Sequence, residues 1–453
     1  MKLIHLVAAC LIGSVVGTAT SAQTNAVSWP AKPITLNDAL DIALQQSPTI
    51  LKGRQDVEEA YGVALQLRSA IRPRFTAGGG FQAIDSAQIE VVNIPGFDFQ
   101  FQNDKNWNAN ILVSQPVYAG GKLRSQARAA GLTREAALAQ FQALVADVLL
   151  LVKIVYDDVL LAAEQIKTQQ ASLELLDREL TDQKRRYEAG TAPRFNVLRA
   201  EVELANVRPK LIRAQNAFRI AKNNLATLLG WNIPKDVLEN IPLELADTLK
   251  AEPFDLSLPV AIAKGLAQRP EVTARQTDEK LRREGVVQAR ADYFPNLSIA
   301  GGYQWQSRNF ADDLSLKTDG WTAGAQMNWS LWDFGLTRGK VEAAKARLER
   351  SRLESDDTVR RVELDVRTAY SNFIEAQQVL ESQRKVIEQA EEAVRLAMAR
   401  NDAGTGTQLD VLSAQTALTD ARTTQALALR DYAVALARLD RAMGEGTRLT
   451  RVD

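Results

Sequence analysis

Apolar residues along this chain recur with two different periods. In residues 75–83 and 107–117 they alternate with polar or small residues, and the alternation returns in residues 297–305 and 321–331. This pattern, held over about nine to eleven residues, is typical of a β-strand that crosses an outer membrane with one face toward lipid. A half-buried hairpin of a soluble protein has the same alternation. Because the hairpin occurs twice, with Trp and Tyr near the strand ends, we favour strands in a membrane.

The rest of the chain has helical spacing. From Val359 to Ala397 apolar residues follow one another at steps of three and four, and a matching seam runs 214 positions earlier, from Val145. A repeat of about 3.5 residues held over this length predicts left-handed coiled-coil packing. In each seam one position of the apolar repeat is occupied by a glutamine, Gln169 in the first copy and Gln383 in the second. We expect this pair to set the register between helices; a position facing a pore is the alternative.

The matching seams belong to a duplication of the chain. AGTAPRFNVLRA at residues 189–200 returns as AGTGTQLDVLSA at 403–414, and LNDALDIALQQSPTI at 36–50 lines up with LPVAIAKGLAQRPEV at 258–272. A copy of about 190 residues is longer than the unit of a solenoid repeat. We therefore predict two copies of one structural unit rather than two or three unrelated domains.

The copies have expected boundaries. The first takes residues 23–230 and the second 258–444, with a proline-containing linker at 231–257 between them and a C-terminal tail at 445–453. Each copy holds a hairpin, a long helix of about 100 Å and a shorter returning helix. The expected ranges are 75–117, 122–188 and 194–229, then 297–332, 336–402 and 408–443. The first short helix cannot return to the hairpins alone, so we expect a further helix at residues 271–292 to complete the return.

Residues 1–22 have the features of a secretory signal peptide. They combine a basic start, an apolar run from residue 3 to 16 and the small-residue exit TATSA. We expect cleavage after Ala22, and we place Cys10 inside the apolar run rather than at a lipid-attachment site. The sequence has one histidine, His5, and one cysteine, Cys10, and both leave with the signal.

The mature chain is poorly equipped for catalysis. Without imidazole and thiol it has no Cys/His metal site, thiol nucleophile or histidine base. Carboxylates remain, and three acidic pairs are adjacent in the sequence: Asp157–Asp158, Asp312–Asp313 and Asp356–Asp357. Neighbours in sequence do not share a helix face, so we interpret these pairs as solvated charge. We expect no enzyme, no catalytic residue, no cofactor and no metal.

Charge and hydropathy narrow the partners. Acidic and basic residues balance at 55 each, so no net charge points to nucleic acid. After residue 22 no apolar run approaches the ~20 residues of a membrane-spanning helix, so strands would make any crossing. Four strands cannot close a barrel, and lipid does not tolerate an open sheet edge. We therefore expect an oligomer in which each chain contributes four strands.

The chain as a whole resembles the TolC-like outer-membrane efflux proteins. The resemblance rests on LNDALDIALQQSP and the matching segment of the second copy, and on the paired hairpins. It also rests on the two turn segments RYEAGTAPRFNVLRAEVELANV and RNDAGTGTQLDVLSAQTALTDA. It implies a mainly α fold with a small transmembrane β-barrel portion: a homotrimer with a twelve-stranded barrel in the outer membrane of a Gram-negative bacterium and a long coiled-coil α-helical tunnel through the periplasm. It also implies a periplasmic adaptor, which docks at the repeated turns, and an inner-membrane transporter.

The repeated turns carry the expected adaptor contacts. Gly190 and Gly404 follow Ala at a helix end, where a left-handed C-cap favours glycine. Thr191 and Thr405 come next, and we expect them to cap the following helix. A well-made helix-turn-helix explains all four residues without a partner, so docking and local structure are both expected roles.

The candidate pore residues are Ser413, Asn196 and, as the one with a charge, Asp410. The resemblance places an acidic side chain here at the narrow end of the tunnel, and a trimer would form a ring of three carboxylates that attracts cations. Ser413 stands where the family often has a second acid, Asn196 is the matching position of the first copy, and Gly406 replaces a basic residue. A salt-bridged closed gate is therefore in doubt. The alternative role for Asp410 is stabilisation of the first helical turn.

Three functions remain open at the level of sequence. The favoured one is the exit duct of a tripartite efflux pump for drugs or metal ions, which conducts substrates passively. The same fold also serves as the outlet of a type I protein secretion system with an ATP-driven transporter. A structural or adhesive coiled-coil protein of the envelope is the third, and the alternating strands with aromatic ends disfavour it.

Overall fold

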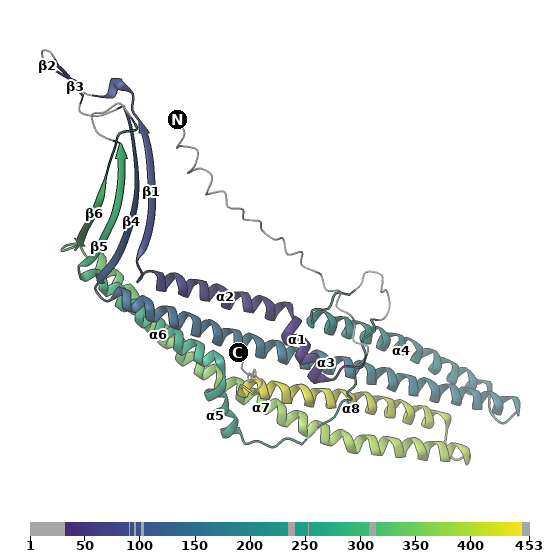
Figure 1. Ribbon diagram of the computed structural model, residues 1–453. Coiled ribbons are helices and arrows are strands. Elements are labelled where there is room, and N and C mark those ends of the chain that lie inside the picture. Colours follow the sequence, from purple (N-terminus) through teal and green to yellow (C-terminus); the bar gives the residue numbers. More distant parts are fainter. Residues whose placement is uncertain are drawn as a thin grey trace.

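The computed structural model describes residues 32–89, 91–94, 97–100, 104–233, 241–251, 253–307 and 314–445. The expected signal peptide and nearly all of the expected C-terminal tail lie outside these residues. Within them the chain forms eight α-helices, six β-strands and two short 3-10 helices (Figure 1). The helices make up most of the chain, which confirms the mainly α fold class.

The elements follow one another in two similar series. The first is α1 (Leu36–Gln46), α2 (Pro48–Ser69), β1 (Arg74–Ala83), η1 (Ser86–Gln88), β2 (Val91–Ile94), β3 (Phe97–Gln100), β4 (Lys105–Ala119), α3 (Lys122–Glu188) and α4 (Arg194–Leu228). The second is α5 (Leu258–Gln268), α6 (Pro270–Arg290), η2 (Ala291–Tyr293), β5 (Asn296–Ser307), β6 (Lys317–Asn328), α7 (Leu336–Asp402) and α8 (Gln408–Met443).

The sheet has the strand order β1-β4-β5-β6, and all its pairs are antiparallel. β4 and β5 join the two hairpins side by side, while β1 and β6 are the edges. β6 ends at Asn328, before the expected 332, so Trp329 and Leu331 lie in the connection to α7 instead of the strand. The Trp329 indole donates to the Tyr293 carbonyl at 3.2 Å, which holds this connection against η2.

The long helices carry the fold away from the sheet. α3 and α7 each have 67 residues, which corresponds to about 100 Å. α4 packs along α3 and α8 along α7, and α8 also contacts α3. α2 and α6 lie against the sheet-proximal part of α3, and α6 also packs on α7 (Figure 1). None of the described helices combines the length and the apolar character needed to cross a membrane.

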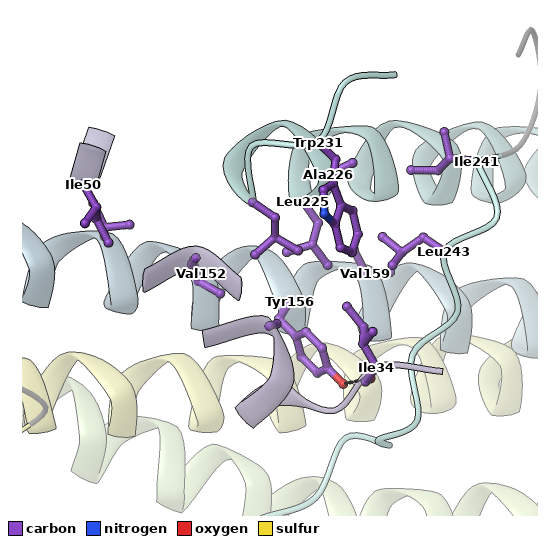
Figure 2. Packing of buried hydrophobic residues seen from close by; sticks show 14 of the residues in the cluster. Ile34, Ile50, Val152, Tyr156, Val159, Leu225, Ala226, Trp231, Ile241 and Leu243 are labelled. Atoms are coloured by element: carbon purple, nitrogen blue, oxygen red, sulfur yellow. Dashed lines mark hydrogen bonds between the residues drawn. The ribbon is translucent and has the colours of Figure 1, made fainter. Parts of the chain in front are cut away.

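The core lies where these helices meet the segments that connect the two series. In one cluster Val145, Val148, Val152 and Val159 of α3 are buried against the end of α4 and the segment that follows it (Figure 2). The Tyr156 hydroxyl lies 3.0 Å from the Ile34 carbonyl and 2.8 Å from a carboxylate oxygen of Asp247. A second cluster repeats the arrangement around Val366, Phe373 and Tyr432 of α7 and α8.

These clusters confirm the predicted seams. Val362, Val366, Phe373 and Leu380 of α7 are buried, as are the corresponding valines of α3. Gln169, the glutamine of the first seam, has a side-chain oxygen that is buried without a hydrogen-bond partner in the part of the chain that the structure describes. Its register-setting role stays a prediction.

Candidate functional site: the paired helical turns

The two repeated turns lie at the same end of the molecule, remote from the sheet (Figure 1). The first turn, residues 189–193, joins α3 to α4, and the second turn, residues 403–407, joins α7 to α8. Arg186 connects the two: its Nη2 lies 2.7 Å from Asp402 Oδ1, and its Nε lies 2.7 Å from Asp182 Oδ2. The hydrogen bond and charge of Asp402 raise the pKa of Arg186, which favours the protonated guanidinium that links the two turns.

Both turns have the same backbone geometry. Gly190 and Gly404 have φ of 74° and 75°, which confirms the predicted left-handed C-caps. In the first turn the Thr191 amide donates to the Arg186 carbonyl at 2.8 Å and the Gly190 amide to the Tyr187 carbonyl at 2.9 Å. The second turn repeats both bonds. This pair of bonds is the Schellman motif, so the repeated sequence encodes one turn shape twice.

The threonines act on the preceding helix, which corrects the prediction that they cap the next one. The Thr191 hydroxyl donates to the Arg186 carbonyl at 3.0 Å, and the Thr405 hydroxyl donates to the Arg400 carbonyl at 3.3 Å. The left-handed glycine reverses the chain, so the residue after it faces the last turn of the helix just completed. The N-caps of α4 and α8 are Pro193 and Thr407.

Asp410 belongs to a capping box at the start of α8. The Thr407 amide and hydroxyl donate to Asp410 Oδ2 at 2.9 and 2.8 Å, and the Asp410 amide donates to the Thr407 hydroxyl oxygen at 3.3 Å. These bonds satisfy amides that the first helical turn leaves free. They lower the pKa of Asp410, with the backbone bond as the largest cause. The alternative role of stabilising the first turn is therefore visible in the structure, and the carboxylate is exposed and charged.

The other two candidate pore residues lie on different surfaces. Ser413 is exposed and lies three positions after Asp410, a spacing that places both on one side of α8. Asn196 is half-buried in the first turn of α4, and its carbonyl accepts a hydrogen bond from Gln408 Nε2 at 3.2 Å. Asn196 thus joins α4 to α8, while Asp410 and Ser413 remain open to solvent in one chain.

Buried glutamines are a feature of this end that the sequence analysis missed. Gln183, Gln408 and Gln415 are 2, 6 and 3 % exposed. They adjoin a cluster of apolar residues from α3, α4 and α8, and each has a side-chain oxygen without a hydrogen-bond partner among the described residues. Extending the α3 seam by its next three-residue step, from Leu180 to Gln183, would have found the first of them.

One adjacent acid pair is also corrected. Asp158 forms an ion pair with Arg430 at 2.7 Å. Asp157 is half-buried and lines an open cavity of about 750 Å³, which lies between α3, α8 and the segment around Asp247. Burial raises the pKa of Asp157 to about 7, with a smaller contribution from Asp158, and Arg430 and Lys153 oppose the shift. Asp157 is therefore less hydrated than the exposed carboxylate that the sequence predicted. The Asp312–Asp313 pair lies outside the described residues.

Comparison with known proteins decides the family. The sequence matches the profile of the family described as outer membrane efflux protein over residues 39–231 and 261–445. The chain belongs to this family. It is 24% identical over 413 residues to the alkaline protease secretion protein AprF of Pseudomonas aeruginosa, covering 89% of this chain and 83% of AprF. It is 24% identical over 410 residues to the outer membrane protein TolC of Vibrio cholerae, covering 89% of each.

The fold of this outer membrane efflux protein is shared with solved structures. The outer-membrane channel OprN superposes with a TM-score of 0.75 at 21% identity, covering 91% of this chain and 90% of that chain. The protein therefore resides in the outer membrane, as the names of its family and relatives state. The relatives are channel and secretion proteins, so the family is one of transport rather than catalysis.

Proposed function

We propose that three copies of this chain form one conduit that serves as the exit duct of a tripartite efflux pump. The sheets of the three copies close a twelve-stranded barrel in the outer membrane, and the long helices form a tunnel through the periplasm. A periplasmic adaptor docks on the turns and connects the duct to an inner-membrane transporter. The duct conducts passively, and the transporter supplies the energy.

Unpaired surfaces of the single chain support assembly with further copies. β1 and β6 each have one side without a strand partner in the described sheet, and lipid does not tolerate such edges. Exposed apolar residues also follow one side of α4: Phe195 is 66% exposed, Val202 57% and Ile212 63%. Helix surfaces of this kind are covered in a stable assembly.

The observation that carries the docking proposal is the pair of identical turns. Gly190–Thr191 and Gly404–Thr405 are exposed, share one backbone shape and are held together by the Arg186–Asp402 ion pair. A protein that recognises one turn therefore meets a second surface of the same shape beside it. The four turn residues are accordingly our proposed adaptor contacts.

Asp410, Ser413 and Asn196 are the proposed pore residues. The exposed carboxylate of Asp410 accepts the Thr407 hydrogen bonds, which favour its ionised form, and three copies would place three such carboxylates around the axis of the trimer. Such a ring attracts cations and slows their release. Ser413 extends the same helix side with a neutral hydroxyl, and Asn196 supports the ring from α4.

A type I secretion outlet is the second candidate function. Its support is the full-length similarity to a protein named for alkaline protease secretion, while the family name supports efflux. Both functions use the same duct, and they differ in the adaptor that docks on it. The identity of that adaptor therefore separates them.

Cross-linking at the second turn tests the proposal. Thr405→Cys places a thiol on the exposed turn, and Thr424→Cys places one on an exposed position of α8 away from it. In living cells we expect Thr405→Cys to capture a periplasmic adaptor that Thr424→Cys does not. An adaptor of a proton-driven pump supports efflux, and one of an ATP-driven exporter supports secretion. Labelling at Thr405→Cys without any captured adaptor contradicts docking and favours the envelope-structural alternative.

A further inference from the structure

The connection from β6 to α7 carries a cluster of exposed apolar side chains. Leu331, Trp332 and Phe334 are 76, 78 and 93 % exposed. The rings of Trp332 and Phe334 pack edge to face, with their centroids 6.1 Å apart. A contiguous exposed patch of this kind marks a contact with a protein or with a membrane.

The position of the cluster favours a membrane as its partner. β6 has 12 residues, and about nine to eleven tilted residues suffice for a strand to cross the hydrocarbon of a membrane. The connection follows the end of β6 that is nearest the helices (Figure 1). Aromatic residues gather at this level, where a transmembrane sheet leaves the hydrocarbon. We therefore expect the cluster to lie among the lipid headgroups on the helix side of the membrane.

The same connection lines an open cavity of about 460 Å³. The other walls are the start of α3, the start of α7 and the link from α6 to β5. Phe294, Trp329 and Leu336 make the walls partly apolar, while Asn296 and Asn328 contribute amides that donate and accept hydrogen bonds. Since a water molecule takes about 30 Å³ in the liquid, the cavity has room for a small polar group.

Two lysines and two aspartates line this cavity. Lys340 Nζ forms an ion pair with Asp292 Oδ2 at 2.7 Å. The Asp333 carboxylate accepts hydrogen bonds from two backbone amides at the start of α7, at 3.1 and 2.7 Å, which fix its position. Lys122 is half-buried and forms no ion pair with any residue that the structure describes. The cavity thus has balanced charge, with one cation left open to a ligand.

We propose that the cavity binds the headgroup of a phosphatidylethanolamine molecule from the helix-side leaflet. The phosphate lies at Lys122, and the ammonium lies at Asp333, whose carboxylate has about four acceptor sites and uses two for the backbone. The acyl chains then run along Trp332 and Phe334. The inference rests on the proposed function in one respect, because it requires the sheet to cross the membrane.

The charges also predict which lipids the cavity rejects. Phosphatidylcholine has the same net charge, but its trimethylammonium group has no N–H to donate to Asp333. Phosphatidylglycerol has no cation at all, so it would leave Asp333 beside a phosphate without a counter-charge. Selection for phosphatidylethanolamine over both is therefore the specific mark of this site.

Lipid retention tests the inference. The full-length protein in detergent is equilibrated with equal amounts of phosphatidylethanolamine, phosphatidylcholine and phosphatidylglycerol that have the same acyl chains. Native mass spectrometry then measures which lipids stay bound. Lys122→Ala removes the phosphate contact, and Lys122→Arg keeps the charge. Arg124→Ala is the matched control, because Arg124 is an exposed cation two positions away and outside the residues that line the cavity.

We expect selective retention of phosphatidylethanolamine, a loss of about tenfold in Lys122→Ala, and retention in Lys122→Arg and Arg124→Ala. Equal retention of the three lipids, or an equal loss in Lys122→Ala and Arg124→Ala, would overturn the inference. Displacement by an equal concentration of O-phosphoethanolamine, which has no acyl chains, would also overturn it, because the cavity would then serve a soluble ligand. Adaptor capture by Thr405→Cys reports on the proposed function separately, so its success beside a failed lipid test would reject the lipid site alone.

Discussion

Gly190 and Gly404 are the residues on which the shape of the turns depends. Both have left-handed φ, and no atom lies within 4 Å of an added Cβ at either position. A side chain would therefore find room at both positions, and the backbone conformation is what favours glycine there. An L-residue in this conformation costs roughly 1–2 kcal/mol.

A pair of alanine substitutions tests this reasoning. Gly404→Ala should lower the local free energy of unfolding of the second turn by about 1 kcal/mol, because alanine is strained at positive φ. Gly62→Ala is the matched control: Gly62 lies inside α2 with open space around its Cβ position, so alanine should stabilise this helix by about 0.5–1 kcal/mol. Amide hydrogen exchange measures both sites, and changes of the same sign at both would contradict the argument.

Single residues at the turns were predictable to different degrees. Glycine after alanine at a helix end has one common use, so the left-handed caps followed from the sequence. The hydroxyls of Thr191 and Thr405 had two helices within reach, and sequence spacing could not choose between them. Asp410 had two roles that do not exclude each other, and the capping box accounts for one of them only.

Among the elements, α3, α6 and α8 are joined by one charged residue. Arg441 of α8 is 7% exposed; its Nε donates to Asp147 of α3 at 2.8 Å, and its Nη2 forms an ion pair with Glu271 of α6. Burial raises the pKa of Glu271, but the hydrogen bond and charge of Arg441 outweigh it and the pKa is lowered. The carboxylate therefore stabilises the fold at neutral pH and loses this contribution as the pH falls below 4.5.

Arg441→Met should lower the free energy of unfolding by about 2 kcal/mol, because it leaves the half-buried Glu271 with a single ion-pair partner among the described residues, Arg269 at 3.3 Å. Adding Glu271→Gln removes that charge, so the double variant should recover part of the loss. Urea unfolding at neutral pH measures the three proteins. A double variant no more stable than Arg441→Met would contradict the pairing.

Asp157 makes the stability of the fold depend on pH in the opposite direction. Its pKa is raised from 3.8 to about 7, so the folded chain holds a proton there that the unfolded chain has released. Stability should therefore fall as the pH rises from about 4 to 7. Asp157→Asn should raise the free energy of unfolding by roughly 2 kcal/mol above pH 7, after allowance for its partial exposure, and leave it unchanged near pH 4. Thermal unfolding across this range checks it, and an equal shift at every pH would contradict it.

At the scale of the whole molecule, the hydrophobic period and the internal duplication of the sequence predicted more of the fold than any single motif did. Long alternating and helical seams mark strands and helices because each buries one side of a regular element. Contacts between remote segments left no such pattern: Ile34 forms a parallel bridge with Leu245, and β4 pairs with β5 across the two series. The short β2–β3 hairpin inside residues 84–105 was missed because four-residue strands are too short to establish a period.

The same scale supports the proposal that several copies of the chain form the working unit. The described sheet of one chain has two open edges, β1 and β6, which strands of further copies would cover in the proposed assembly. The turns lie at the opposite end, so a passage through the assembly would run from the sheet to the surroundings of Asp410. Charge at Asp410 should therefore act on ions that cross the whole molecule.

Single-channel recording is the most direct test. Purified protein in a planar lipid bilayer should give stepwise conductance that multivalent cations block from the side of the turns. Asp410→Asn keeps an oxygen for the Thr407 hydrogen bonds but removes the charge, so it should relieve the block. Thr407→Ala weakens the cap and keeps the charge, so it should remain blocked. The absence of conductance steps, or a block in Asp410→Asn equal to that of the unmodified protein, would contradict the account.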